Sequence, residues 1–166
     1  MNQSTQKIFD GLLLVLKDNL IAQGGFSTFA GAIGMDGELH LFNFAAPSQD
    51  DDLPMAALEP LPRRDKNADV LNLWRDKTWP KVIKALSQAI GKDDYEVCGV
   101  CCPARVVFAK APDRMYEAGY CHIEGADGTV FGAVVAIEQG PRGYKLGKPV
   151  MLPARPSLFP VKRRRA

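Results

Sequence analysis

The sequence predicts a single α+β domain built on one antiparallel sheet. Its 166 residues suit one domain, and 46% of them are hydrophobic, enough for a sizeable core. Two Asp-Gly dipeptides, at Asp36 and Asp127, each lie between apolar runs, as the turns of β-hairpins do. We expect residues 1–152 to form this domain and residues 153–166 to be a proline-rich basic tail.

The chain is expected to begin with a helix over residues 5–22. Gly24-Gly25 ends it. Residues 26–46 follow as a β-hairpin, with Asp36-Gly37 as a type I′ turn, because that dipeptide tolerates positive φ. The apolar side chains of the helix recur at spacings of three and four, which places them on one stripe: Ile8, Phe9, Leu12, Leu13, Leu16 and Leu20.

A loop and a second helical segment follow the hairpin. Residues 47–67 contain four prolines and an acidic run, so we expect a loop there. Residues 68–90 are expected to be helical, with a kink or split at Pro80 and Thr78 as the cap of the second part. The apolar stripe of this helix is Trp79, Val82, Ile83, Leu86 and Ile90.

Three further strands and a short edge strand are expected in the second half: 95–109, 114–124, 129–138 and 144–152. Strands that are almost wholly apolar are buried on both faces, which places 26–35 and 129–138 in the middle of the sheet. Pro103 favours an edge position for 95–109. The sheet is therefore expected to have five or six strands, with the first five in the order 2-1-5-4-3.

This element order resembles that of the roadblock, longin and profilin-like group, whose five-stranded antiparallel sheet has the order 2-1-5-4-3 with helices packed on it. The likeness covers residues 5–138 and rests on topology, so it implies a fold and no activity. Residues 29–38 and 120–128 also resemble a group of small uncharacterised bacterial proteins with two Asp-Gly hairpins. Glu124, Asp127 and Gly128 match the second hairpin of that group, some of whose members look like immunity or accessory proteins.

Charge and hydropathy limit the classes of partner. The formal net charge is +2, but four of the 21 Lys and Arg residues are Lys162, Arg163, Arg164 and Arg165. Without these four, the chain has 17 basic and 19 acidic residues, a net charge of −2. The fold therefore carries no basic face of the kind that binds nucleic acid. The longest apolar run, 12–16, is too short to cross a membrane, and we find no secretory signal, so we expect a cytoplasmic protein.

Four cysteines are candidate metal ligands: Cys98, Cys101, Cys102 and Cys121. Cys98 and Cys101 form a C-x-x-C motif, which occurs in zinc sites. However, a single C-x-x-C motif is a weak signal, and alternation along a strand turns Cys101 away from the face that Cys98 and Cys102 share. Because cysteine also packs well as a small hydrophobe, we expect buried free thiols and no metal or other cofactor.

Three residues are candidates for catalysis: Cys121, His122 and Glu124. His122 and Glu124 are two residues apart and share a strand face, as a general base and its carboxylate would. Cys121 points to the opposite face, so it does not form a Cys–His pair with its neighbour. We interpret the pair as an ordinary polar strand face, and a thiol- or His/Glu-dependent hydrolase is the alternative.

The function expected from these observations is a non-enzymatic protein-binding module. The sheet is apolar on both faces, yet only two helical segments are available to cover it, so one face is closed by the C-terminal segment or by a second copy in a homodimer. An immunity or accessory protein to a partner toxin or enzyme is the alternative. The candidate partner-contacting residues are Trp74, Asp50, Asp51, Asp52, Arg163 and Arg164.

Overall fold

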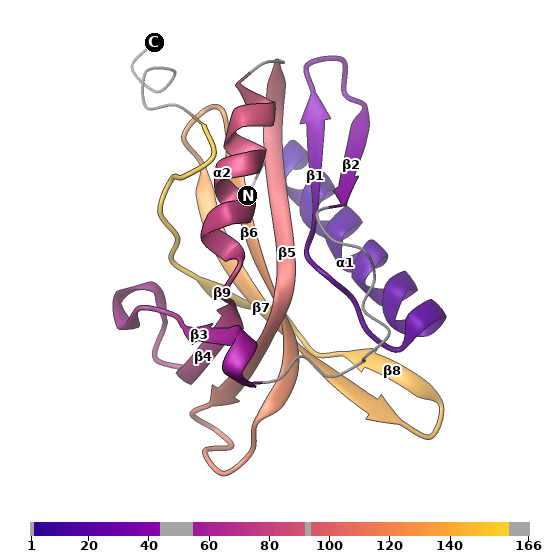
Figure 1. Cartoon of the computed structure of the whole chain (residues 1–166), viewed down its shortest axis with the longest axis vertical. Helices are drawn as coiled ribbons and strands as arrows, with labels where there is room; N and C mark the ends of the chain where they lie inside the picture. Colours follow the sequence, from indigo (N-terminus) through magenta and orange to yellow (C-terminus); the bar gives the residue numbers. More distant parts are fainter. Residues whose placement is uncertain (1, 44–54, 92–93, 160–166) are drawn as a thin grey trace.

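The computed structural model describes residues 2–43, 55–91 and 94–159. These residues form a curled antiparallel sheet with one helix on each face (Figure 1), which confirms an α+β fold with an N-terminal helix. The sheet has nine strands, more than the five or six expected. The elements are α1 (Gln3–Gln23), β1 (Phe29–Gly34), β2 (Leu39–Asn43), β3 (Leu58–Pro60), β4 (Val70–Asp76), α2 (Trp79–Ile90), β5 (Tyr95–Phe108), β6 (Tyr116–Gly125), β7 (Val130–Gly140), β8 (Gly143–Leu146) and β9 (Val150–Leu152), with short 3-10 helices at Met55–Ala57 and Arg63–Asp65.

The long strands β5 and β6 form the centre of the sheet. The main order is β2-β1-β5-β6-β7-β8. The first half of β5 pairs with β1 and its second half with β4, while β7 pairs with β9 near its start and with β8 near its end. The predicted order 2-1-5-4-3 is therefore wrong, because the first strand pairs with residues 95–108 and not with 129–138.

Pro103 does not place β5 at an edge, because the strand changes partners at this residue. The pairing with β1 ends at Cys101, and the pairing with β4 begins at Ala104. The N–H of Ala126, at the end of β6, donates to the carbonyl of Glu96, so the even-numbered residues of β5 turn their backbone groups toward β6. The nitrogen of Pro103 therefore points to the other side, into the gap between β1 and β4. The missing N–H therefore removes no ladder hydrogen bond, and a proline fits in a central strand.

Both predicted Asp-Gly hairpins are present. Asp36-Gly37 lies between β1 and β2, and Asp127-Gly128 lies between β6 and β7. The glycines have φ of 82° and 96°, and no other residue type in the described part of the chain has positive φ. The predicted type I′ turn is thus wrong, because it needs positive φ at two positions; a type I turn followed by a left-handed glycine fits instead.

The helix predicted over residues 68–90 is only half helical. Its first part is strand β4, and α2 begins at Trp79. Val70 and Leu73 are the buried residues of β4. Their spacing of three resembles a helical stripe, but here it arises from a bulge between Val70 and Asn72.

The start of α2 is as predicted in position, because Thr78 precedes the helix and Pro80 lies in its first turn, where a missing N–H is tolerated. The side chain of Thr78 makes no capping hydrogen bond, however, and its Oγ1 donates to Oδ1 of Asp76 at 2.8 Å instead. The loop predicted over 47–67 contains β3 and the two 3-10 helices, and its residues 47–54 lie outside the described residues.

Helix α1 covers one face of the sheet. Two glycines of the central strands allow the helix to approach closely, because a Cβ at Gly99 would lie 2.8 Å from Leu12 Cδ1 and one at Gly119 would lie 3.0 Å from Leu16 Cδ2. The buried side chains of α1 are Thr5, Ile8, Phe9, Leu12, Leu16 and Leu20, which include most of the predicted stripe.

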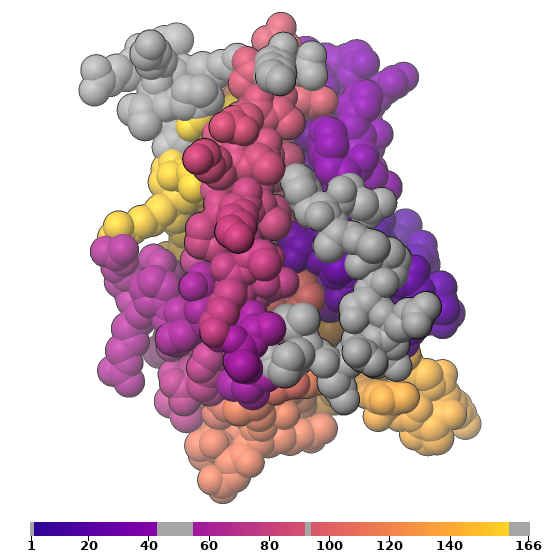
Figure 2. Space-filling model, viewed as in Figure 1, coloured from indigo at the N-terminus to yellow at the C-terminus, as the bar shows by residue number. Residues whose placement is uncertain are grey.

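Helix α2 and the C-terminal segment 153–159 together cover the other face. Leu158 and Phe159 are buried in the same cluster as Trp79, Leu86 and other apolar residues of α2. Figure 2 shows α2 with the C-terminal segment beside it. The described part of the predicted tail is therefore packed against the domain and closes one face of the sheet.

Candidate functional site

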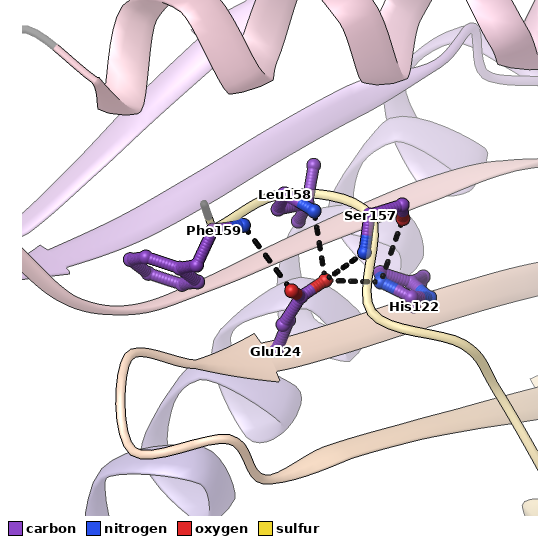
Figure 3. A network of polar contacts seen from close by, with 5 residues as sticks. All are labelled: His122, Glu124, Ser157, Leu158 and Phe159. Atoms are coloured by element: carbon purple, nitrogen blue, oxygen red, sulfur yellow. Dashed lines mark hydrogen bonds and ion pairs between the residues drawn. The ribbon is translucent and has the colours of Figure 1, made fainter. Parts of the chain in front are cut away.

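Two polar side chains, His122 and Glu124, are buried on the α2-covered face of β6. Their side chains are 4% and 0% exposed. Nε2 of His122 lies 3.0 Å from Oε2 of Glu124 (Figure 3). The two residues share one strand face, as their spacing predicts.

The C-terminal segment supplies three more partners of Glu124 (Figure 3). The N–H groups of Ser157 and Leu158 each donate to Oε2 at 2.9 Å, and the N–H of Phe159 donates to Oε1 at 3.2 Å. Burial alone would raise the pKa of Glu124, but the hydrogen bonds from His122 and from these three amides outweigh it and lower the pKa below its ordinary value. The carboxylate is therefore ionised at neutral pH and ties the C-terminal segment to β6.

The arrangement does not match that of a catalytic triad. Oγ of Ser157 lies 3.4 Å from Nε2 of His122, the same nitrogen that contacts Glu124. In a triad, the carboxylate orients the imidazole through one nitrogen, and the other nitrogen accepts the proton of the nucleophile. Here the ionised carboxylate accepts a hydrogen bond from Nε2–H, so this nitrogen already carries a proton and cannot take one from Ser157. These contacts connect β6 to the C-terminal segment and do not activate the hydroxyl of Ser157.

Aromatic and cationic groups surround this network. The ring of Trp79 lies edge-on to His122 and to Tyr120, with centroid distances of 6.1 and 5.2 Å. The guanidinium of Arg75 lies over Trp79 at 4.8 Å and near Tyr120 at 5.5 Å. Sequence reasoning missed Arg75 and Ser157, because Arg75 lies in a segment predicted to be helical and Ser157 in a segment predicted to be a tail.

The four cysteines are free, buried and divided between the two faces. Cys98 and Cys102 belong to the core under α2, whereas Cys101 and Cys121 belong to the core under α1. Burial raises the pKa of Cys98 and of Cys102 far above the ordinary value. The hydrogen bond with Cys121 and burial both raise the pKa of Cys101. The sulfurs are thus not gathered into one ligand set, and the thiols whose pKa is raised resist forming thiolates.

The structure describes one of the six predicted partner-contacting residues. Trp74 lies on β4, not on a helix, where it is half-buried and pairs with Pro60 and Arg105. Trp79, five residues on, is in the core. The other predictions lie outside the described residues: Asp50, Asp51, Asp52, Arg163 and Arg164.

A different surface, at strand β2, exposes apolar side chains. Leu39 and Leu41 are 39% and 54% exposed, and Leu14 of α1 is 61% exposed. A Cβ at Gly11 would lie 3.6 Å from Leu39, so the flank of α1 that carries Leu14 borders β2. We call these three leucines and the outer backbone of β2 the β2 edge surface. Nothing in the sequence marked it, because β2 reads as an ordinary amphipathic strand.

The hairpin tip beside this surface carries a small polar cluster. Asp36, Glu38 and His40 each have a side-chain atom that could bind a metal ion, a carboxylate oxygen or an imidazole nitrogen. These atoms lie within 4.8 Å of one another, and all three residues are exposed. Oδ1 of Asp36 accepts the N–H of Glu38 at 3.0 Å, a contact that shapes the turn. The ring of His40 packs edge-on against Tyr95. These contacts account for the arrangement without a ligand.

Comparisons with protein family models, with curated proteins and with solved structures found no match. None of the helices in the described part of the chain combines the length and the apolar character needed to cross a membrane.

Proposed function

We propose that the protein is a non-enzymatic binding module that docks a protein partner through the β2 edge surface. The observation that carries the proposal is the edge strand itself. In the described part of the chain, β2 has β1 on one side and no strand on the other. An edge of this kind presents a row of backbone donors and acceptors to which another chain can add a strand.

The sequence of β2 supports docking, because it lacks three of the features that protect edge strands. Natural edges are often interrupted by proline, by lysine or by a β-bulge. Strand β2 reads Leu-His-Leu-Phe-Asn, and its pairing with β1 shows no register shift. The exposed leucines beside it provide the apolar contact that an interface needs at its centre.

The buried polar network supports the same class of function. A hydrolase needs a base that is free to accept a proton from a nucleophile or a water molecule. The Nε2 proton of His122 is directed at Glu124, both oxygens of Glu124 accept hydrogen bonds from backbone amides, and the two side chains are 4% and 0% exposed to the water that a hydrolase would activate. The residues best suited to acid–base chemistry are thus used to hold the fold together.

Site-specific photocrosslinking in the cells that make the protein tests the proposal. A benzophenone amino acid replaces Leu41, and in a matched control it replaces Leu71, which is 40% exposed on β4 between β3 and β5. We expect a discrete protein adduct from position 41 and none from position 71. The same adducts from both positions, or none from either, would contradict the proposal.

A further inference from the structure

We infer that the partner at the β2 edge surface is a second copy of this chain, paired antiparallel through β2 about a two-fold axis at Leu41. The inference rests on the proposed function and names its partner. The hydrogen bonds of the β1–β2 hairpin show which residues of β2 turn their backbone groups outward. The N–H of Gly34 donates to the carbonyl of Glu38 at 3.0 Å, so these two residues form a hydrogen-bonded pair of the hairpin. Such pairs alternate along an antiparallel ladder, so His40 and Phe42 turn their backbone groups toward β1.

The same alternation turns the backbone groups of Leu39, Leu41 and Asn43 outward. These residues pair with Ile33, Gly31 and Phe29 at the positions that exchange no hydrogen bonds within the hairpin. Two copies related by a two-fold axis at Leu41 place Leu41 opposite Leu41, and Leu39 opposite Asn43. Every outward N–H and C=O of the three residues then meets its complement, so the edge is complementary to itself.

The side chains fit this pairing. Leu39 and Leu41 point to the α1 face, since both contact the position that a Cβ of Gly31 would occupy, together with Ile8. In the paired form, the leucines of both copies lie together in the groove between the two α1 helices. The exposed Leu14 of each copy borders this groove. The apolar surface that each copy exposes to water is thereby covered.

The charges beside the strand are also complementary under this symmetry. Nζ of Lys7 contacts the carbonyl of Gly37 at 3.0 Å, so the beginning of α1 lies at the hairpin tip and the helix runs in the same direction as β2. Asp18 is on the same flank as Lys7, Gly11 and Leu14, about 16 Å beyond Lys7 along the helix, and the neighbouring exposed positions carry Asp10 beside Lys7 and Lys17 beside Asp18. A two-fold axis at Leu41 brings the Lys7 end of each copy toward the Asp18 end of the other. The strand itself carries no carboxylate or ammonium group at a paired position.

Introducing opposite charges at Leu41 in two variants tests the two-fold symmetry of the dimer. The full-length chain is prepared as wild type, Leu41→Lys and Leu41→Glu, with Leu71→Lys as the control on β4. Sedimentation equilibrium gives the dimer dissociation constant of each sample. Far-UV circular dichroism and thermal melting confirm that the variants are folded, as expected for a position that is half exposed.

We expect the wild type and Leu71→Lys to dimerise equally. Each Leu41 variant alone should bind itself at least about tenfold more weakly, because two like charges meet at the axis. An equimolar mixture of the two Leu41 variants should recover the dimer, because only a residue that faces its own copy is rescued in this way.

Two results would overturn the inference. One is a wild type that stays monomeric at all concentrations, and the other is a dimer that the Leu41 variants leave unchanged. In either case, a photocrosslink from position 41 to a different protein would leave the proposed function standing. The absence of any adduct specific to position 41 would remove the proposed function as well.

Discussion

Replacement of Glu124 by glutamine tests whether the buried carboxylate holds the C-terminal segment on the sheet. The carboxylate accepts hydrogen bonds from His122 and from the amides of Ser157, Leu158 and Phe159. Glutamine keeps the shape of the side chain, and its carbonyl oxygen can replace Oε2. Its amide nitrogen then faces the N–H of Phe159, where two donors meet and one hydrogen bond is lost.

The magnitude follows from these contacts. A hydrogen bond to a charged group contributes about 1.5–3 kcal/mol, and one between neutral groups contributes about 1 kcal/mol. Glutamine removes one charge-assisted bond and weakens the other three, while the cost of burying a charge disappears. We expect the free energy of unfolding to fall by about 2–4 kcal/mol.

The assay is urea-induced unfolding followed by tryptophan fluorescence, combined with hydrogen exchange of the amides of residues 157–159. Glu117→Gln is the matched control, because Glu117 lies on the same strand but is 53% exposed and pairs with Arg105 at 2.8 Å. An exposed ion pair of this kind contributes about 0–1 kcal/mol. The reasoning would be refuted if Glu124→Gln were as stable as Glu117→Gln and the three amides kept their protection.

Below about pH 5 the wild type should lose stability as the pH falls, because the pKa of Glu124 is lower in the folded protein than in the unfolded chain; the Glu124→Gln variant should show a smaller loss in urea titrations at each pH. The native thiols should react with a disulfide reagent at pH 8 only after urea is added, since all four are buried; a rapidly modified cysteine in the native protein would contradict this. Gly99→Ala should destabilise the fold by about 1–3 kcal/mol through its 2.8 Å contact with Leu12, whereas Gly11→Ala, with an ordinary 3.6 Å contact inside a helix, should be neutral or stabilising; equal urea midpoints for the two variants would argue against close packing of α1.

The sequence was sufficient to predict the parts of the fold that depend on local signals. The Asp-Gly dipeptides identified both hairpins, and the apolar stripe of α1 identified its buried face. The order of the strands was not predicted, because it depends on which strand changes partners along its length. Pro103 indicated an edge only under the assumption that one neighbour runs along the whole of β5.

The candidate site was predictable only in part, for a similar reason. The two-residue spacing correctly placed His122 and Glu124 on one face. Their other partners are backbone amides more than thirty residues away along the chain. A backbone amide has the same chemistry in nearly every residue type, so no feature of the sequence identifies which three of them bind a carboxylate.

The Glu124 partners lie more than thirty residues after the carboxylate, which has a consequence for how the protein is made. A ribosome completes α2 and the central strands well before it adds residues 157–159. Until those residues emerge, the carboxylate lacks the three backbone amides that they donate, and the apolar sites filled by Leu158 and Phe159 stay open. The face of the sheet under α2 must therefore stay incomplete until residues 157–159 are made, and a product cut at residue 152 would lack part of its own interior.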